Sequence, residues 1–138
     1  NRIRQSKIGE RENFEIFRCK TIYSRKRFEE FIRATWIRPE DAKLFDKYVS
    51  VMKIATRRIE KPTAIVEAYA SEKFDGNLLE LMDPVHAAAF APLIIDNKAF
   101  PADWATSGIG GACADNCIKC GRCAKTLELV LKNGDGND

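Results

Sequence analysis

The chain has 138 residues, a length that fits one domain able to bury a core without disulfide or metal staples. With 45% hydrophobic and 31% charged residues, its composition excludes a disordered chain. No apolar run approaches about 18 residues, so we expect no membrane span. The first ten residues are polar and basic and do not resemble a signal peptide, so we expect a cytoplasmic protein.

The net charge of +3 is unevenly distributed along the chain. Residues 1–38 hold eleven Lys or Arg and five Glu, a balance of +6, whereas residues 39–138 carry twelve Lys or Arg and fifteen acids, a balance of −3. A basic segment of this kind is either a solvated face or a docking face for an anionic partner such as RNA.

Apolar periodicity in the first half of the chain predicts strands and helices in alternation. A short strand is expected to end near Cys19. A helix over residues 24–34 should bury three side chains at helical spacing, namely Phe28, Phe31 and Ile32. A second helix begins at Pro39, and its expected buried stripe is Leu44, Phe45 and Tyr48. Residues 51–55 then predict a second strand.

The second half continues this alternation. A helix over residues 62–71 should face inward with Ile65, Val66 and Tyr69. Two further helical pieces are expected, over residues 78–82 and 85–90. Residues 93–95 predict a third strand. The last helix is expected over residues 124–132, with Leu127, Val130 and Leu131 on one side, and Gly134 stands where a helix would stop.

Strands separated by helices favour an α/β fold with a mainly parallel sheet. In such folds chemistry gathers at the carboxyl ends of the strands, where Cys19 and Arg57 would lie. We therefore predict a βα-repeat portion over residues 1–105. Residues 106–138 would form a cysteine-rich metal-binding loop and a carboxyl-terminal helix.

Four of the five cysteines form the run Cys113-x3-Cys117-x2-Cys120-x2-Cys123. Thiolates at this spacing can turn toward one point and ligate a shared metal, which the run favours over disulfides. Structural zinc sites usually use two separated pairs, so the single tight run favours a 4Fe–4S cluster, with zinc as the alternative. The fifth cysteine, Cys19, is either a buried structural residue or a substitute ligand.

Few other residues suggest chemistry. Lys53 and Arg57 lie on either side of the end of the predicted second strand, either as partners in salt bridges or as contacts for an anionic substrate. His86 is the only histidine, so any His-dependent nucleophilic set would have to use it. No catalytic residue can be assigned from the sequence.

Three stretches together resemble the collagenase-like peptidase family of unassigned mechanism. They are Trp36-Ile37-Arg38-Pro39-Glu40-Asp41, then Met52-Lys53-Ile54-Ala55-Thr56-Arg57, then Tyr69 followed by Phe74-Asp75-Gly76-Asn77-Leu78-Leu79. The resemblance covers roughly residues 14–125 and is to the carboxyl-terminal half of the family's proteins.

The resemblance implies a part of a TIM-barrel-like fold and a 4Fe–4S cluster held by four cysteines. It also implies oxygen-independent hydroxylation or modification of RNA or of a small aromatic precursor, served by a redox partner. By the same resemblance, Cys19 falls near a cluster cysteine and Arg57 matches a strand-end arginine. Two alternatives remain open: a structural zinc module with a basic face that docks nucleic acid or protein, and a metal-dependent peptidase, a hydrolase.

Overall fold

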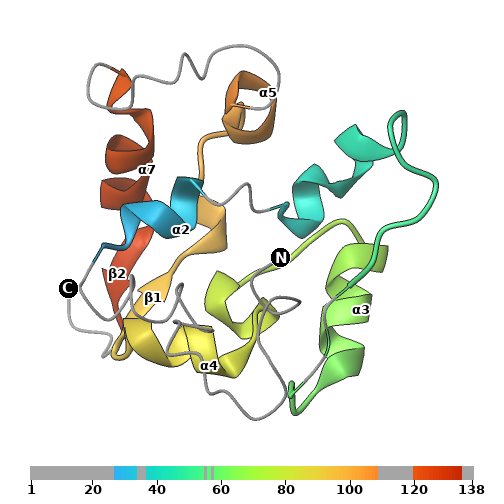
Figure 1. Ribbon diagram of the computed structural model, residues 1–138, viewed down its shortest axis with the longest axis horizontal. Coiled ribbons are helices and arrows are strands. Elements are labelled where there is room, and N and C mark those ends of the chain that lie inside the picture. The colour runs from blue at the N-terminus through green and yellow to red at the C-terminus, as the bar shows by residue number, and fades with distance from the viewer. Residues whose placement is uncertain (1–26, 34–36, 55, 57, 109–119, 135–138) are drawn as a thin grey trace, which may run out of the picture.

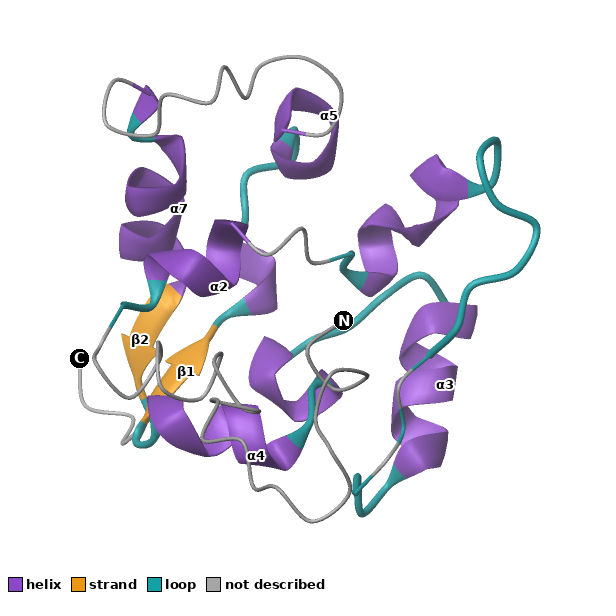
Figure 2. Cartoon of the chain, viewed as in Figure 1, coloured by secondary structure: helices purple, strands orange, loops and turns teal. Residues whose placement is uncertain are grey.

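The computed structural model describes residues 27–33, 37–54, 56, 58–108 and 120–134. In this part of the chain short helices surround a small sheet (Figures 1 and 2). The α-helices are α2 (Glu29–Arg33), α3 (Pro62–Ala70), α4 (Pro84–Ala87), α5 (Trp104–Gly108) and α7 (Arg122–Val130). The 3-10 helices are η2 (Pro39–Phe45), η3 (Leu78–Leu81), η4 (Ala88–Phe90) and η5 (Asn97–Ala99). The strands are β1 (Leu93–Ile95) and β2 (Leu131–Asn133).

The sheet is an antiparallel pair of β1 and β2, with Ile94 opposite Lys132. The pairing continues beyond both strands, since the Asp96 N–H donates to the Val130 carbonyl at 2.8 Å and the Gly134 N–H donates to the Pro92 carbonyl at 3.1 Å. The predicted strand at residues 93–95 is therefore confirmed. Its partner is the end of the predicted last helix, which stops at Val130 and continues directly as β2.

The core lies where α2 and α7 pack together above the sheet (Figure 1). Phe28, Phe31 and Ile32 are buried as predicted, and they contact a centre that also includes Val130. Phe90 lies between two of these rings, with its centroid 4.7 Å from that of Phe28 and 5.5 Å from that of Phe31. The apolar face of α2, near the start of the described chain, thus packs against α7, near its end.

The helices at residues 62–70, 78–81 and 84–90 are confirmed, but one predicted inward face is only partly correct. Ile65 is 1% exposed, whereas Val66 on the next position of α3 is 49% exposed and faces solvent. Tyr69 is half-buried, and its hydroxyl donates to the Ile37 carbonyl at 2.8 Å. α3 therefore contacts the core through one narrow stripe and packs beside η2.

The predicted helix that begins at Pro39 forms as the 3-10 helix η2, and its expected buried stripe is wrong. Leu44 is 42% exposed and Tyr48 is 70% exposed. Phe45, the third member of the predicted stripe, is half-buried. The helix ends at Phe45 and residues 46–48 form a turn, so Tyr48 does not continue its face. The buried members of η2 are instead Pro39 and Asp41.

The predicted strand at residues 51–55 is wrong for residues 51–54, which have no regular structure. Val51 is 82% exposed, whereas Ile54 packs against the core, and no described segment pairs with this stretch as a strand. The strand expected before Cys19 lies outside the described residues. Within the described residues the sheet is antiparallel, and the parallel βα array and the division at residue 105 stay predictions.

Helices of the described residues are all too short or too polar to cross a membrane.

Candidate functional site

Two of the predicted metal ligands, Cys120 and Cys123, lie on either side of Gly121 at the start of α7. Gly121 has φ +60°, the left-handed conformation that glycine adopts without strain, and a Cβ there would meet no other atom. The glycine is therefore needed for the turn of the backbone into α7 rather than for space. This turn leaves Cys120 exposed and Cys123 half-buried.

The position at a helix amino terminus suits thiolate ligands. Backbone N–H groups and the helix dipole give this end of α7 a positive potential, which complements the negative charge of metal-bound sulfur. Both sulfur-bearing residues keep accessible surface, so a metal or cluster can reach them. Their chemistry fits either a 4Fe–4S cluster or zinc, because both take thiolate ligands.

The remaining predicted ligands, Cys19, Cys113 and Cys117, lie outside the described residues. Among the residues that are described, no three His, Cys, Asp or Glu side chains gather into a metal-binding group. The structure therefore describes two of the four cysteines of the run, Cys120 and Cys123.

Arg122 attaches α5 to the cysteine end of α7. Its guanidinium lies 5.4 Å from the centroid of the Trp104 ring and donates to the Trp104 carbonyl at 3.2 Å and the Asp103 carbonyl at 3.3 Å. These contacts hold the start of α5 against the residue that lies between the two cysteines.

Of the two predicted anion-binding residues, the structure describes Lys53. Lys53 is exposed in the irregular segment, and Arg57 lies outside the described residues. The neighbouring Arg58 is exposed with φ +63° and lines a cavity that also contacts α3. The basic pair of residues 57 and 58 is the sequence signal that points to Arg58.

A buried ion pair organises the segment that begins at Ile37. The guanidinium of Arg38 donates to both carboxylate oxygens of Asp41, with Nε to Oδ2 at 2.6 Å and Nη2 to Oδ1 at 2.9 Å. Arg38 is 6% exposed and Asp41 is 5% exposed. A third donation runs from Arg38 Nη1 to the Asn97 carbonyl at 3.3 Å, and the guanidinium lies 4.7 Å from the Phe100 ring centroid.

Asn97 extends this network to a third segment. Its Nδ2 atom donates to Glu40 Oε1 at 2.9 Å and to the Phe74 carbonyl at 2.8 Å, while the Phe74 N–H donates to the same Glu40 oxygen at 2.7 Å. These two acceptors fix the orientation of the amide, whose Oδ1 atom is buried without a donor among the described residues. Two of the stretches that carry the family resemblance therefore meet here in a structural network.

Asp96 fastens the end of β1 to β2. Its carboxylate accepts from Lys132 Nζ at 2.6 Å and from the Lys98 N–H at 2.9 Å. The hydrogen bond from Lys132 is the main reason that the pKa of Asp96 is lowered from its usual value.

Tyr69 has the largest change in acidity in the described residues. Burial, with a smaller contribution from the negative charge of Glu40, raises the pKa of its hydroxyl from 10.0 to about 12. The folded protein therefore holds this proton more tightly than the unfolded chain does.

We expect this difference to make stability depend on pH in the alkaline range. The contribution is fully present below the unfolded pKa of about 10 and is lost as pH rises through the folded value of about 12. Urea unfolding at a series of alkaline pH values should show a shallower loss for Tyr69→Phe than for the wild type. The exposed Tyr48→Phe serves as the control, and an equal effect of both substitutions would contradict the assignment.

No protein-family model matches the chain, and no solved structure matches it. Over 110 residues it is 36% identical to a protein of Methanocaldococcus jannaschii that is named an uncharacterized protease. The match covers 78% of this chain but 32% of that protein, so the chain spans about a third of the relative's length. Most of this chain is therefore similar to one part of a protein that bears the name protease.

Proposed function

We propose that this chain is the cluster-binding part of a collagenase-like peptidase family protein with a TIM-barrel-like fold. In this proposal Cys113, Cys117, Cys120 and Cys123 hold a 4Fe–4S cluster, and Cys19 can replace one of them. The observation that carries the proposal is the pair of accessible cysteines at the amino terminus of α7. The similarity to a protease-named protein supports the family in a coarser way.

When bound, a 4Fe–4S cluster supplies electron transfer or an iron that holds an oxygen-bearing substrate. The residues of this chain have separate tasks around it. The amino terminus of α7 offers a positive potential to a negatively charged cluster, Gly121 turns the backbone between two ligands, and Arg122 keeps α5 beside them. Lys53 and Arg57 would contact an anionic substrate. The reaction proposed is oxygen-independent hydroxylation or modification of RNA or of a small aromatic precursor, supplied with electrons by a redox partner.

Metal analysis of protein purified without oxygen tests the cluster. We expect a brown protein with about four irons and matching acid-labile sulfide per chain. Cys120→Ser and Cys123→Ser should each lose most of the bound iron, because each removes one of four ligands. Cys19→Ser measures whether the fifth cysteine takes part.

Two results would contradict the cluster. One is unchanged iron in both single variants, which would place the ligands elsewhere. The other is a colourless protein with one zinc per chain, which would make the cysteine run a structural clamp. In that second case the thiols would fix the start of α7, and the basic residues would provide a docking face for nucleic acid or protein.

The name of the relative favours one further candidate, a metal-dependent peptidase. Such an enzyme needs a metal-activated water beside a general base. The sequence contains no HExxH motif, so the candidate requires ligands of another pattern. Release of amino groups from casein that stops with a chelator would support it.

A further inference from the structure

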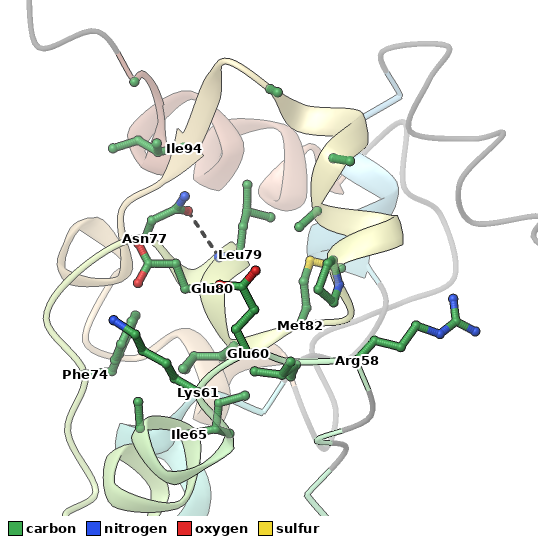
Figure 3. Close-up of a pocket in the computed structure, with 18 of the residues that line it drawn as sticks. Arg58, Glu60, Lys61, Ile65, Phe74, Asn77, Leu79, Glu80, Met82 and Ile94 are labelled. Carbon is green, nitrogen blue, oxygen red and sulfur yellow. Dashed lines mark hydrogen bonds between the residues drawn. The ribbon is translucent and has the colours of Figure 1, made fainter.

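The cysteine end of α7 does not border the open cavity that Figure 3 shows. This cavity of about 810 Å³ is lined by residues of α3, η3, α4 and the β1–β2 hairpin, and none of its lining residues belongs to α7. Arg122 connects the start of α7 to α5 instead. The contacts that hold the two described cysteines in place are therefore to be found along these two helices.

The two described cysteines differ in how the fold restrains them. Cys123 lies within α7 and packs against the core cluster that includes Val130. Cys120 is exposed and precedes Gly121, which has no Cβ to limit its backbone conformation. The core thus restrains Cys123, whereas the position of Cys120 depends on contacts that fix the turn at Gly121.

Arg122 follows this glycine directly and provides such contacts. Its Nη2 atom donates to the Trp104 carbonyl at 3.2 Å and to the Asp103 carbonyl at 3.3 Å, and it lies 3.8 Å from the Asp103 carboxylate. The guanidinium also lies 5.4 Å from the centroid of the Trp104 ring. Together these contacts attach the turn at Gly121 to the start of α5.

The start of α5 is itself attached to the core. Trp104 packs against the core cluster, and its ring meets that of Phe100 edge to face at a centroid separation of 5.6 Å. Phe100 is buried, and the guanidinium of Arg38 lies 4.7 Å from its ring centroid. Two cations and two rings thus form a continuous series from the Arg38–Asp41 ion pair to the start of α7. Since aromatic pairs and cation–π contacts both stabilise, α5 is a fixed support for Arg122.

We infer that Arg122 is a positioning residue for the cysteine site, which holds Cys120 in place relative to Cys123 so that the protein retains bound metal. The inference rests on the metal binding proposed above for the cysteine run and names a residue that preorganises it. A ligand that is fixed before the metal binds loses less conformational entropy on binding. By linkage, bound metal must in turn stabilise the contact between Arg122 and α5.

Release of iron to an excess of chelator, measured without oxygen on the loaded full chain, tests this role. Arg122→Ala should lose iron about tenfold faster than the wild type, because it removes charge-assisted hydrogen bonds and a cation–π contact. Lys125→Ala is the matched control, since it removes the same charge from an exposed position of the same helix. Equal acceleration in both variants would show that Arg122 acts through its charge, and it would overturn the inference.

A variant on the other side of the contact separates positioning from charge. Trp104→Leu keeps every charge and removes the ring beside Arg122, so iron release should be about threefold faster than in the wild type. The double variant Arg122→Ala with Trp104→Leu should release iron no faster than Arg122→Ala alone, because both changes remove the same contact. Trp104 also packs against the core, so urea unfolding is measured in parallel and release is compared far below the unfolding transition.

Hydrogen exchange in α5 gives a readout that a purely structural role would not change. Removal of the metal from the wild type should speed exchange at residues 104–108, whereas removal from Arg122→Ala should not. If the wild type holds zinc, zinc release is followed in the same way. A wild type that retains metal, with unchanged release and exchange in Arg122→Ala, would overturn this inference and leave the proposed function standing. A wild type that holds neither iron nor zinc would contradict both.

Discussion

Substitution of Arg38 by Ala is expected to lower the free energy of unfolding by about 3–5 kcal/mol. The substitution leaves the Asp41 carboxylate buried without the guanidinium that satisfies both of its oxygens. It also removes the donation to the Asn97 carbonyl and the contact with the Phe100 ring. The energy reflects an uncompensated buried charge more than the loss of an attraction.

Urea unfolding followed by circular dichroism measures this loss. Arg33→Ala is the control, because Arg33 forms an exposed ion pair with Glu30 and should cost at most about 1 kcal/mol. The double variant Arg38→Met with Asp41→Leu should recover much of the stability, since it removes both buried charges together. A loss below about 1 kcal/mol in Arg38→Ala would show that Asp41 is not desolvated as described.

Phe90→Ala is expected to cost about 3–5 kcal/mol as well, through a different mechanism. Phe90 is fully buried and its ring contacts those of Phe28 and Phe31 on α2. The substitution leaves a cavity between α2 and η4 that neighbouring side chains can fill only in part.

Thermal and urea unfolding of Phe90→Ala should agree on the size of this loss. Tyr48→Ala removes a ring that is 70% exposed and should change stability by at most about 0.5 kcal/mol. Phe90→Leu should lie between the two, because it keeps most of the buried volume. Equal stability of Phe90→Ala and the wild type would mean that the aromatic contacts do not organise this core.

Helical periodicity predicted the parts of the fold that pack one apolar stripe against the core. Phe28 just before α2, Phe31 on α2, Ile65 on α3 and Val130 on α7 are buried as their spacing indicated. Such patterns are local, so a single sequence is enough to find them.

Periodicity failed where the backbone changes type. Leu131 continues the apolar side of the last helix, yet it begins β2 and pairs with Ile95 of β1. This partner lies almost forty residues earlier in the chain, so local periodicity does not reveal the strand. Leu44 and Tyr48 fit one α-helix, but the segment forms a 3-10 helix that ends at Phe45, and both side chains are exposed. Propensity also suggested a strand at Val51, where nothing in the described residues pairs with it.

In the candidate site, too, features that depend on local spacing could be predicted, whereas contacts between distant segments could not. Cysteine spacing is local, so the sequence alone is enough to propose a shared metal site, and the structure describes two of these residues, Cys120 exposed and Cys123 half-buried, around the start of α7. The contacts of Arg38 with Asn97 and of Arg122 with Trp104 join distant segments, so no local pattern could reveal them.

Gly134 is exposed, yet the structure leaves no room there for a larger residue. The sequence predicted a helix stop at this residue. In the structure its N–H instead extends the antiparallel pairing of β1 and β2 by donating to the Pro92 carbonyl. A Cβ at this position would overlap that carbonyl oxygen, and the backbone of Pro92 cannot move aside as a flexible side chain would. Intolerance to substitution at this solvent-facing residue would therefore reflect steric closure of the sheet, and it would not identify a surface that binds anything.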